Sequence, residues 1–143
     1  MKPAQIRRTA APQATSKTWT RLIQWISMPH MLVTVAELPE YLRCSERLLS
    51  DSERANIVDY LSAMPKAGDL IPGTGGVRKL RWSRGGRGKS GGVRVIYYFH
   101  SERMPLYLLT VFGKNEQSNL SAAERNELAQ FTAVLKRMTG KGP

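Results

Sequence analysis

The chain has 143 residues and carries 22 Lys and Arg against 11 Asp and Glu, which gives a net charge of +11 and a pI near 10.3. Its length suits one domain with a modest core, and its charge indicates a polyanionic partner such as RNA, DNA, an acidic protein or an anionic membrane surface. The single cysteine, Cys44, excludes an internal disulfide, and no apolar run approaches the roughly 18 residues of a membrane span, so we expect a cytoplasmic protein without membrane contact.

Residues 1–30 differ in composition from the rest of the chain. They contain Lys and Arg but no acidic residue, with Pro, Thr, Ala and Gln between the charges. The apolar stretch 22–26 is shorter than the roughly seven residues that a secretory signal needs. The composition also resembles a transit peptide, and a translation start at Met28 or Met31 is a further reading. We predict that residues 1–30 are a disordered or extraneous basic segment and that the domain comprises residues 31–143.

The domain is predicted to begin with a short apolar strand over residues 32–36, the first strand of a sheet. A short helix follows Pro39. Its apolar residues at helical spacing predict an inward face made of Leu42, Leu48 and Leu49.

A second helix is predicted over residues 52–64, capped by Asp51 or Ser52 and ended by Pro65. The residues expected to face inward are Ile57, Tyr60, Leu61 and Met64. The stretch 68–76 is rich in Gly and Pro and is therefore predicted to be a turn-rich connection.

Three strands are predicted next, over residues 77–82, 93–99 and 106–112, with sequential antiparallel pairing as the simplest topology. The period of two along the first of them divides its side chains between two faces. One face is expected to carry Val77, Lys79 and Arg81, and the other Arg78, Leu80 and Trp82. Two basic side chains therefore project from the same side of the sheet.

The last predicted element is a helix that runs to about Met138. Ser121 and Glu124 have the spacing of a capping box at its start. Its expected inward stripe is Leu128, Phe131, Leu135 and Met138. The elements together predict an α+β domain, in which a small antiparallel sheet is preceded by two helices and followed by one.

The stretch GGRGKSGG, residues 85–92, looks at first like a phosphate-binding loop. The pattern needs a glycine five residues before its Gly-Lys-Ser, where this chain has Ser83. A strand follows the stretch, whereas a phosphate-binding loop opens a helix. We therefore interpret it as a basic turn between two strands and expect no nucleotide cofactor.

Basic residues gather between Val77 and Arg94 with no carboxylate among them. They are Arg78, Lys79, Arg81, Arg84, Arg87, Lys89 and Arg94. Such a run is often only a solvated face, but a hairpin brings these charges together and favours binding of a polyanion. Trp82, Tyr97 and Tyr98 are either stacking surfaces for unpaired bases or core residues, and one of the two tyrosines is expected to face inward.

Three motifs in this order, GTGGVRKLRW, GRGKSGGVRVIYY and LLTVFGKNEQSNLSAAERNEL, resemble the HigB-type branch of the RelE superfamily of bacterial toxins. The resemblance covers roughly residues 32–138. It implies a microbial-ribonuclease-like fold, in which helices pack on a small twisted antiparallel sheet. It also implies an endoribonuclease that cleaves mRNA in the ribosomal A site. A cognate antitoxin is implied too, commonly of helix-turn-helix type, through which alone the toxin would contact operator DNA.

The resemblance also suggests site residues. The superfamily's basic pair on one strand matches Lys79 and Arg81, its arginine after the hairpin turn matches Arg94, and its basic residue after the third strand matches Lys114. Further RNA contacts are expected from Arg78, Arg84, Arg87, Lys89, Tyr97 and Tyr98.

This chain departs from several relatives at two positions. Asn115 stands where they have an arginine, and Leu120 where they have a tyrosine. The role of that tyrosine in stacking on the base or in proton transfer would therefore move to Tyr97 or Tyr98, or be absent.

RNA cleavage by the neighbouring 2′-OH needs a base, stabilisation of the phosphorane and protonation of the leaving 5′-oxygen. Neither His30 nor His100 falls in a matched motif. A lysine among cationic neighbours can serve as a base, so we expect Lys79 to be the base or proton shuttle. Arg81 and Arg94 would hold the phosphate, and Lys114 would support one of these roles.

No His, Cys or clustered-carboxylate group has the spacing of metal ligands, so we expect no metal and no cofactor. Two other functions remain open from the sequence. One is a non-catalytic RNA- or ribosome-binding protein that uses the same basic hairpin, and the other is a degenerate toxin that retains only antitoxin binding.

Overall fold

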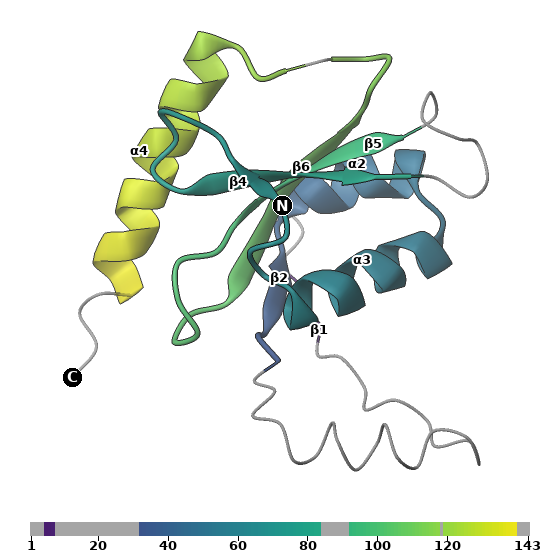
Figure 1. Ribbon diagram of the computed structural model, residues 1–143, viewed down its shortest axis with the longest axis horizontal. Helices are drawn as coiled ribbons and strands as arrows, with labels where there is room; N and C mark the ends of the chain where they lie inside the picture. Colours follow the sequence, from purple (N-terminus) through teal and green to yellow (C-terminus); the bar gives the residue numbers. More distant parts are fainter. Residues whose placement is uncertain (1–4, 8–31, 84–91, 118, 140–143) are drawn as a thin grey trace.

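The computed structural model describes residues 5–7, 32–83, 92–117 and 119–139 (Figure 1). Its strands within these ranges belong to one sheet of six, in the order β1-β2-β6-β5-β4-β3. In chain order the elements are β1 (Gln5–Arg7), β2 (Val35–Glu37), α2 (Pro39–Leu48), α3 (Asp51–Ala63), β3 (Asp69–Leu70), β4 (Val77–Trp82), β5 (Val93–Tyr98), β6 (Leu106–Gly113) and α4 (Ala122–Thr139).

The predicted α+β class is confirmed, with α2 and α3 before the main strands and α4 after them. The three predicted strands pair in sequence and antiparallel, β4 with β5 and β5 with β6. The sheet is nevertheless mixed, because β2 runs parallel to β6. A parallel pair needs a long crossover connection, and the helices and strands between β2 and β6 provide one.

Strand β1 lies within the basic segment 1–30 and pairs antiparallel with β2. Residues 1–4 and 8–31 lie outside the described part of the chain. The predicted boundary between a basic segment and a domain from residue 31 therefore stays a prediction.

The two helices that precede the main strands cover one face of the sheet (Figure 1). Helix α2 begins with Pro39, a residue well suited to the first helical turn. Leu42 of the helix and Leu49, which caps its end, are buried and Leu48 is partly buried, as predicted. Together with Ile57 and Leu61 of α3, most of these residues pack against the sheet strands in one apolar cluster.

Two predictions for α3 are corrected. Its N-cap is Ser50, whose Oγ accepts a hydrogen bond from the Glu53 backbone N–H, while Glu53 Oε1 accepts one from the Ser50 N–H, both at 3.1 Å. The N-cap is therefore neither Asp51 nor Ser52, because only Ser50 has a glutamate three residues later, as a capping box requires. The predicted inward residues Tyr60 and Met64 are 40% and 54% exposed, and Val58 is buried instead.

Helix α4 lies on the opposite face of the sheet from α2 and α3 (Figure 1). The predicted capping box is present, because Ser121 Oγ accepts from the Glu124 N–H at 3.1 Å and Glu124 Oε1 accepts from the Ser121 N–H at 3.0 Å. Leu135 is buried against Val77, Ile96 and Phe112, with Leu128 partly buried beside them. The inward stripe is completed by the buried Thr132, whereas Phe131 and Met138 are 38% and 72% exposed, contrary to prediction.

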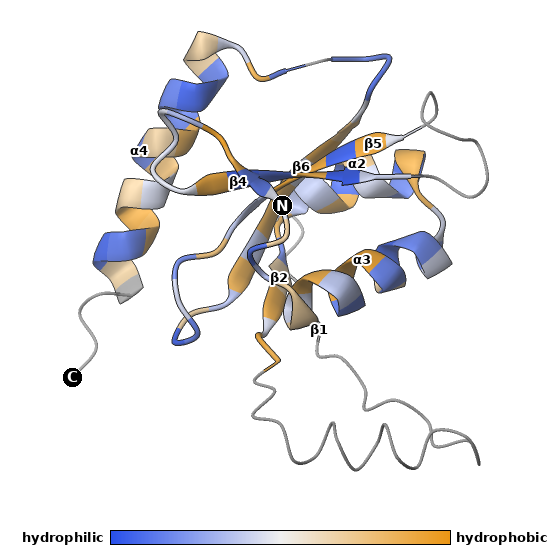
Figure 2. Ribbon diagram, in the orientation of Figure 1, coloured by the Kyte–Doolittle hydropathy of each residue, from blue (hydrophilic) through white to orange (hydrophobic). Residues whose placement is uncertain are grey.

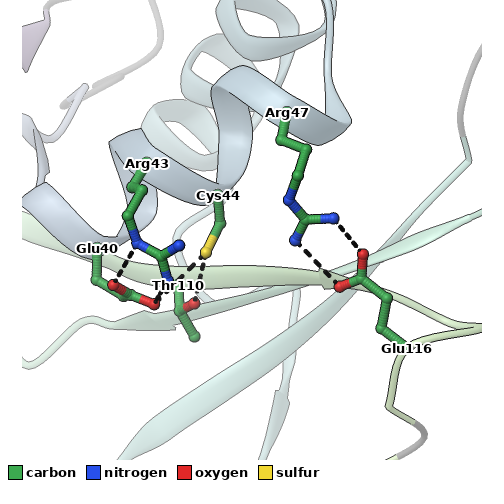
Figure 3. Close-up of polar contacts among 6 residues, drawn as sticks. All are labelled: Glu40, Arg43, Cys44, Arg47, Thr110 and Glu116. Carbon is green, nitrogen blue, oxygen red and sulfur yellow. Dashed lines mark hydrogen bonds and ion pairs between the residues drawn. The ribbon is translucent and has the colours of Figure 1, made fainter.

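Polar contacts join α2 to β6 and to the turn that follows it (Figure 3). Thr110 Oγ1 of β6 lies 3.9 Å from Cys44 Sγ of α2. Arg47 holds Glu116 through two contacts, of which Nη2 to Oε2 is 3.3 Å. The segment after β6 is therefore held to α2 by the Arg47–Glu116 ion pair.

Among the described residues, no helix is both long and apolar enough to cross a membrane.

Candidate functional site

Three of the predicted catalytic cations lie on the same face of the β4–β5 hairpin. Lys79 and Arg81 alternate with Leu80 along β4, so both side chains project on the side of Val77, which packs in the α4 cluster. Arg81 is the direct cross-strand partner of Arg94 on β5. Figure 2 shows the corresponding hydrophilic stretches along β4 and β5. The alternation therefore predicted the common face of Lys79 and Arg81 correctly, and the strand pairing adds Arg94 to it.

Arg94 is buried, with only 9% of its surface exposed. Its Nη1 donates to the Val93 carbonyl at 3.4 Å, and no ion pair among the described residues supplies it with a carboxylate. Burial and, secondarily, the facing Arg81 charge lower the pKa of Arg94. Like charges directly opposite on paired strands repel each other. A bound anion between the two guanidinium groups would relieve that repulsion.

Lys79 is partly buried, and its ammonium donates a hydrogen bond to Asn119 Oδ1 at 3.1 Å. It also lines a pocket of about 420 Å³ between the edge of the sheet and the start of α4. The other polar residues of this pocket are Asp69, Asn119 and Arg125. Lys79 therefore links the cation cluster to a cavity large enough for a small ligand.

Lys114 lies at the end of the sheet where Arg81 and Arg94 are found. It follows Gly113, the partner of Val93, and its backbone N–H donates to the Gly92 carbonyl at 3.1 Å. Its side chain is exposed. The Arg47–Glu116 ion pair anchors the same turn two residues later. The four residues predicted to be catalytic thus occupy one region of the β4–β5–β6 sheet.

The two departures from the expected pattern also fall in the segment after β6. Asn115 is exposed, and Leu120 is partly buried against the α4 cluster. Leu120 also lines the pocket beside Lys79. The position at which the resemblance led us to expect a tyrosine is therefore an apolar wall of that pocket.

Arg78 and Tyr97 lie on the face opposite the cation cluster. Arg78 Nη1 donates to the Gly68 and Lys66 carbonyls at 2.7 and 3.2 Å. The Tyr97 hydroxyl donates to the Pro65 carbonyl and accepts from the Gly68 N–H, both at 2.8 Å. Both side chains hold the connection between α3 and β3 in place, so the geometry supports a structural role for them.

Both predicted stacking tyrosines are buried, Tyr97 in the cluster under α2 and α3 and Tyr98 in the cluster under α4. Burial raises the pKa of each phenol. Their rings offer no exposed face to a base, which argues against the RNA-stacking role expected of them. Trp82 is partly buried, and its ring centroid lies 5.7 Å from that of Tyr60.

Arg84, Arg87 and Lys89, which were predicted to contact RNA, lie outside the described residues, as does His30. His100 follows β5 at the end away from Arg94, where its ring stacks near Tyr98 with a centroid distance of 6.3 Å. Within the described ranges, no group of three or more His, Cys, Asp or Glu side chains is placed to hold a metal ion.

The sequence interpretation did not single out Asp69, Asn119 or Arg125, which line the pocket beside Lys79. Asn119 stands two residues before the cap of α4, so its place at the helix start follows from the capping box. Its hydrogen bond to a strand 40 positions earlier in the chain has no local signal. Asp69 pairs directly with Lys79 in the β3–β4 register, which the turn-rich composition of the stretch concealed.

Facing arginines beside a lysine can bind a phosphodiester and stabilise additional negative charge on it. A family model described as the RelE toxin of the RelE / RelB toxin-antitoxin system matches residues 46–142. The match includes Lys79, Arg81, Arg94 and Lys114, and it spans every strand from β3 to β6.

Proposed function

This chain belongs to the RelE toxin family, and from that premise we propose that it is a metal-independent endoribonuclease which cleaves mRNA in the ribosomal A site. Membership of the family makes the protein the toxin of a toxin–antitoxin system and implies an antitoxin partner. Toxins of this family are generally ribonucleases that inhibit translation. We also propose that it belongs to the HigB-type branch of the family and that it acts in the cytoplasm. Its antitoxin, we propose, is of helix-turn-helix type, and the toxin contacts operator DNA only through that antitoxin.

The observation that carries the proposal is the group formed by Lys79, Arg81 and Arg94. Three cations share one face of a hairpin, and the most buried of them has no carboxylate partner among the described residues. Maintaining a buried cation beside a second one costs stability. A phosphodiester bound there offsets part of this positive charge, which gives the arrangement a function.

The proposed reaction is attack by the RNA's own 2′-OH on the adjacent phosphorus. Lys79, as the general base, takes the 2′-OH proton, and the new O2′–P bond produces a phosphorane. Arg81 and Arg94 hold its extra negative charge through charge-assisted hydrogen bonds. The P–O5′ bond then breaks, the leaving oxygen takes a proton from Lys79 or from water, and the products are a 2′,3′-cyclic phosphate and a 5′-hydroxyl. Lys114 supports the charge at the same end of the sheet.

The test is primer extension on a defined mRNA incubated with the purified protein, once as naked RNA and once on ribosomes with an empty A site. Cleavage within the A-site codon only on the ribosome supports the proposal. Cleavage of naked RNA indicates instead a ribosome-independent nuclease.

The two other functions are separated by the same assay. If neither RNA sample is cleaved while the protein still binds ribosomes, the protein is a non-catalytic ribosome-binding protein. If the protein also fails to bind ribosomes but forms a complex with its antitoxin, it is a degenerate toxin. Asn115→Arg and Leu120→Tyr are then the first substitutions to test for a return of activity.

A further inference from the structure

The turn that follows β6 carries Lys114, and a side chain of α2 reaches this turn. Arg47 forms an ion pair with Glu116, two residues after Lys114, through two contacts, of which Nη2 to Oε2 is 3.3 Å (Figure 3). We propose that Arg47 is a positioning residue for RNA cleavage, which acts by fixing Lys114 through Glu116. The role of Lys114 in that reaction rests on the proposed function.

The backbone of the turn is shaped by its own hydrogen bonds. The Lys114 N–H donates to the Gly92 carbonyl at 3.1 Å, which ties the turn to the start of β5. The Glu116 N–H donates to the Gly113 carbonyl at 3.0 Å, which closes the turn on itself. Neither bond reaches the helices. The ion pair with Arg47 therefore fixes where the turn lies relative to α2.

The side chain of Glu116 folds back over Gly113, the last residue of β6, toward α2. A methyl group on Gly113 would lie 3.8 Å from Glu116 Cγ and Cδ and 3.9 Å from Leu48 Cδ2. The glutamate, the end of the strand and the end of the helix thus meet at this glycine. Arg47 precedes Leu48 and holds Glu116 at this meeting point. Such a contact leaves the turn fewer conformations and so preorganises the groups that it carries.

The ion pair also decides what the Glu116 carboxylate does. Glu116 is the only acidic residue between Met104 and Ala123. No ion pair among the described residues involves Lys114, although Glu116 is only two residues away. A carboxylate released by Arg47 would attract the Lys114 ammonium and repel a phosphodiester. Arg47 therefore keeps Lys114 available for the RNA.

The exposure of the pair separates a positioning role from a purely structural one. The side chains of Arg47 and Glu116 are 56% and 39% exposed, and ion pairs at such positions contribute little to stability. Loss of the pair should therefore leave the protein folded. A change in cleavage rate then reports on the placement of Lys114 and not on unfolding.

The experiment is a double-mutant cycle between Arg47 and Lys114 in single-turnover A-site cleavage at saturating ribosome concentration. Arg47→Ala should lower the rate by about 10-fold, less than the about 10²–10³ that loss of a charged donor itself costs, with little change in the concentration for half saturation. Glu116→Ala should lower it by a similar factor. In a Lys114→Ala background, Arg47→Ala should cost less than about twofold, because the group that it positions is gone.

Arg43→Ala is the matched control. Arg43 lies one turn earlier on α2 and pairs with Glu40 of the same helix at 2.7 Å, so its loss removes the same charge without touching the turn after β6. It should keep the wild-type rate. An Arg47→Ala variant as active as this control, or an Arg47→Ala loss that persists in full in the Lys114→Ala background, overturns the proposal.

Hydrogen exchange of the Lys114 amide gives a second measurement, which does not need cleavage. Exchange should be faster in Arg47→Ala than in Arg43→Ala, because the bond to the Gly92 carbonyl then opens more often. Faster exchange in a protein that cleaves no mRNA supports the anchoring of Lys114 and refutes the proposed function. A-site cleavage by the wild type, with equal exchange and equal rates in the two variants, does the reverse.

Discussion

Lys79 Nζ donates a hydrogen bond to Asn119 Oδ1 at 3.1 Å, which joins the middle of β4 to the segment that leads into α4. Gln117 reinforces the same segment, since its Nε2 donates to the Asn119 carbonyl at 2.8 Å and to Glu124 Oε1 at 3.0 Å. Lys79, the proposed catalytic base, is therefore positioned by a chain of hydrogen bonds that begins in the α4 capping box.

Asn119→Ala should consequently lower the rate of ribosome-dependent cleavage by about 10- to 100-fold, because a misplaced catalytic group costs rate without unfolding the protein. Single-turnover cleavage at saturating ribosome concentration measures this loss, with little change expected in the concentration needed for half saturation. Asn126→Ala, an exposed position on α4, serves as the control and should keep the wild-type rate. An Asn119→Ala variant as active as the control would show that Lys79 needs no such positioning.

Arg94→Met should strongly lower the cleavage rate and yet leave the protein at least as stable as the wild type. Loss of a preorganised donor typically costs about 10²–10³ in rate. The methionine side chain fills similar space without the cost of a buried cation facing Arg81, so we expect the free energy of unfolding to rise by about 1 kcal/mol. Urea denaturation followed by circular dichroism measures it. A clear destabilisation together with full activity would assign Arg94 to the fold and not to the reaction.

Ser50→Ala should destabilise the protein by about 0.5–2 kcal/mol, the usual cost of losing an N-cap. Ser50 accepts the hydrogen bond that closes the start of α3. Ser52→Ala, two residues further and exposed, is the matched comparison and should change stability by less than about 0.5 kcal/mol. Equal effects of the two substitutions in denaturant titrations would contradict the capping assignment.

Acidification should weaken the start of α4 through Glu124. The backbone hydrogen bond from Ser121 holds the pKa of this carboxyl below its usual 4.5. Its contribution to stability is therefore present above that value and is lost as the pH falls through the lower, folded-state pKa. In Glu124→Gln, which does not titrate, the free energy of unfolding should fall less between pH 7 and pH 3 than in the wild type. Identical pH profiles for the two proteins would rule out this contribution.

Chelation should leave cleavage intact. The proposed chemistry uses only lysine and arginine side chains, so EDTA added to pre-formed ribosome complexes, within the limits of ribosome stability, should not change the cleavage rate. Restoration of a lost activity by one particular divalent ion, with the ribosomes still assembled, would refute the metal-independent mechanism.

Local patterns predicted the parts of the molecule that local interactions determine. The alternation along β4 placed Lys79 and Arg81 together, and the serine–glutamate spacing located the start of α4. Tyr97 and Tyr98 show the limit, because the sheet is covered on both faces and adjacent strand residues are then both buried. In a sheet covered by helices on one face only, one of the two tyrosines would be exposed.

The pocket could not be predicted because it depends on contacts between distant segments. Asp69 reaches it through pairing with β4, and Asn119 through the path of the chain after β6. The same holds for Tyr60 and Met64 of α3, whose helical spacing is correct but whose side of the helix depends on where the sheet lies.

The parallel pairing of β2 with β6 has a consequence for synthesis of this toxin. Strand β6 lies between β2 and β5, so β2 can join the hairpin that carries Lys79, Arg81 and Arg94 in one sheet only after β6 has formed. Contacts between segments so distant in sequence form late in folding. The nascent chain therefore carries Lys79, Arg81 and Arg94 on β4 and β5 before β6 has joined their hairpin to β2 in one sheet.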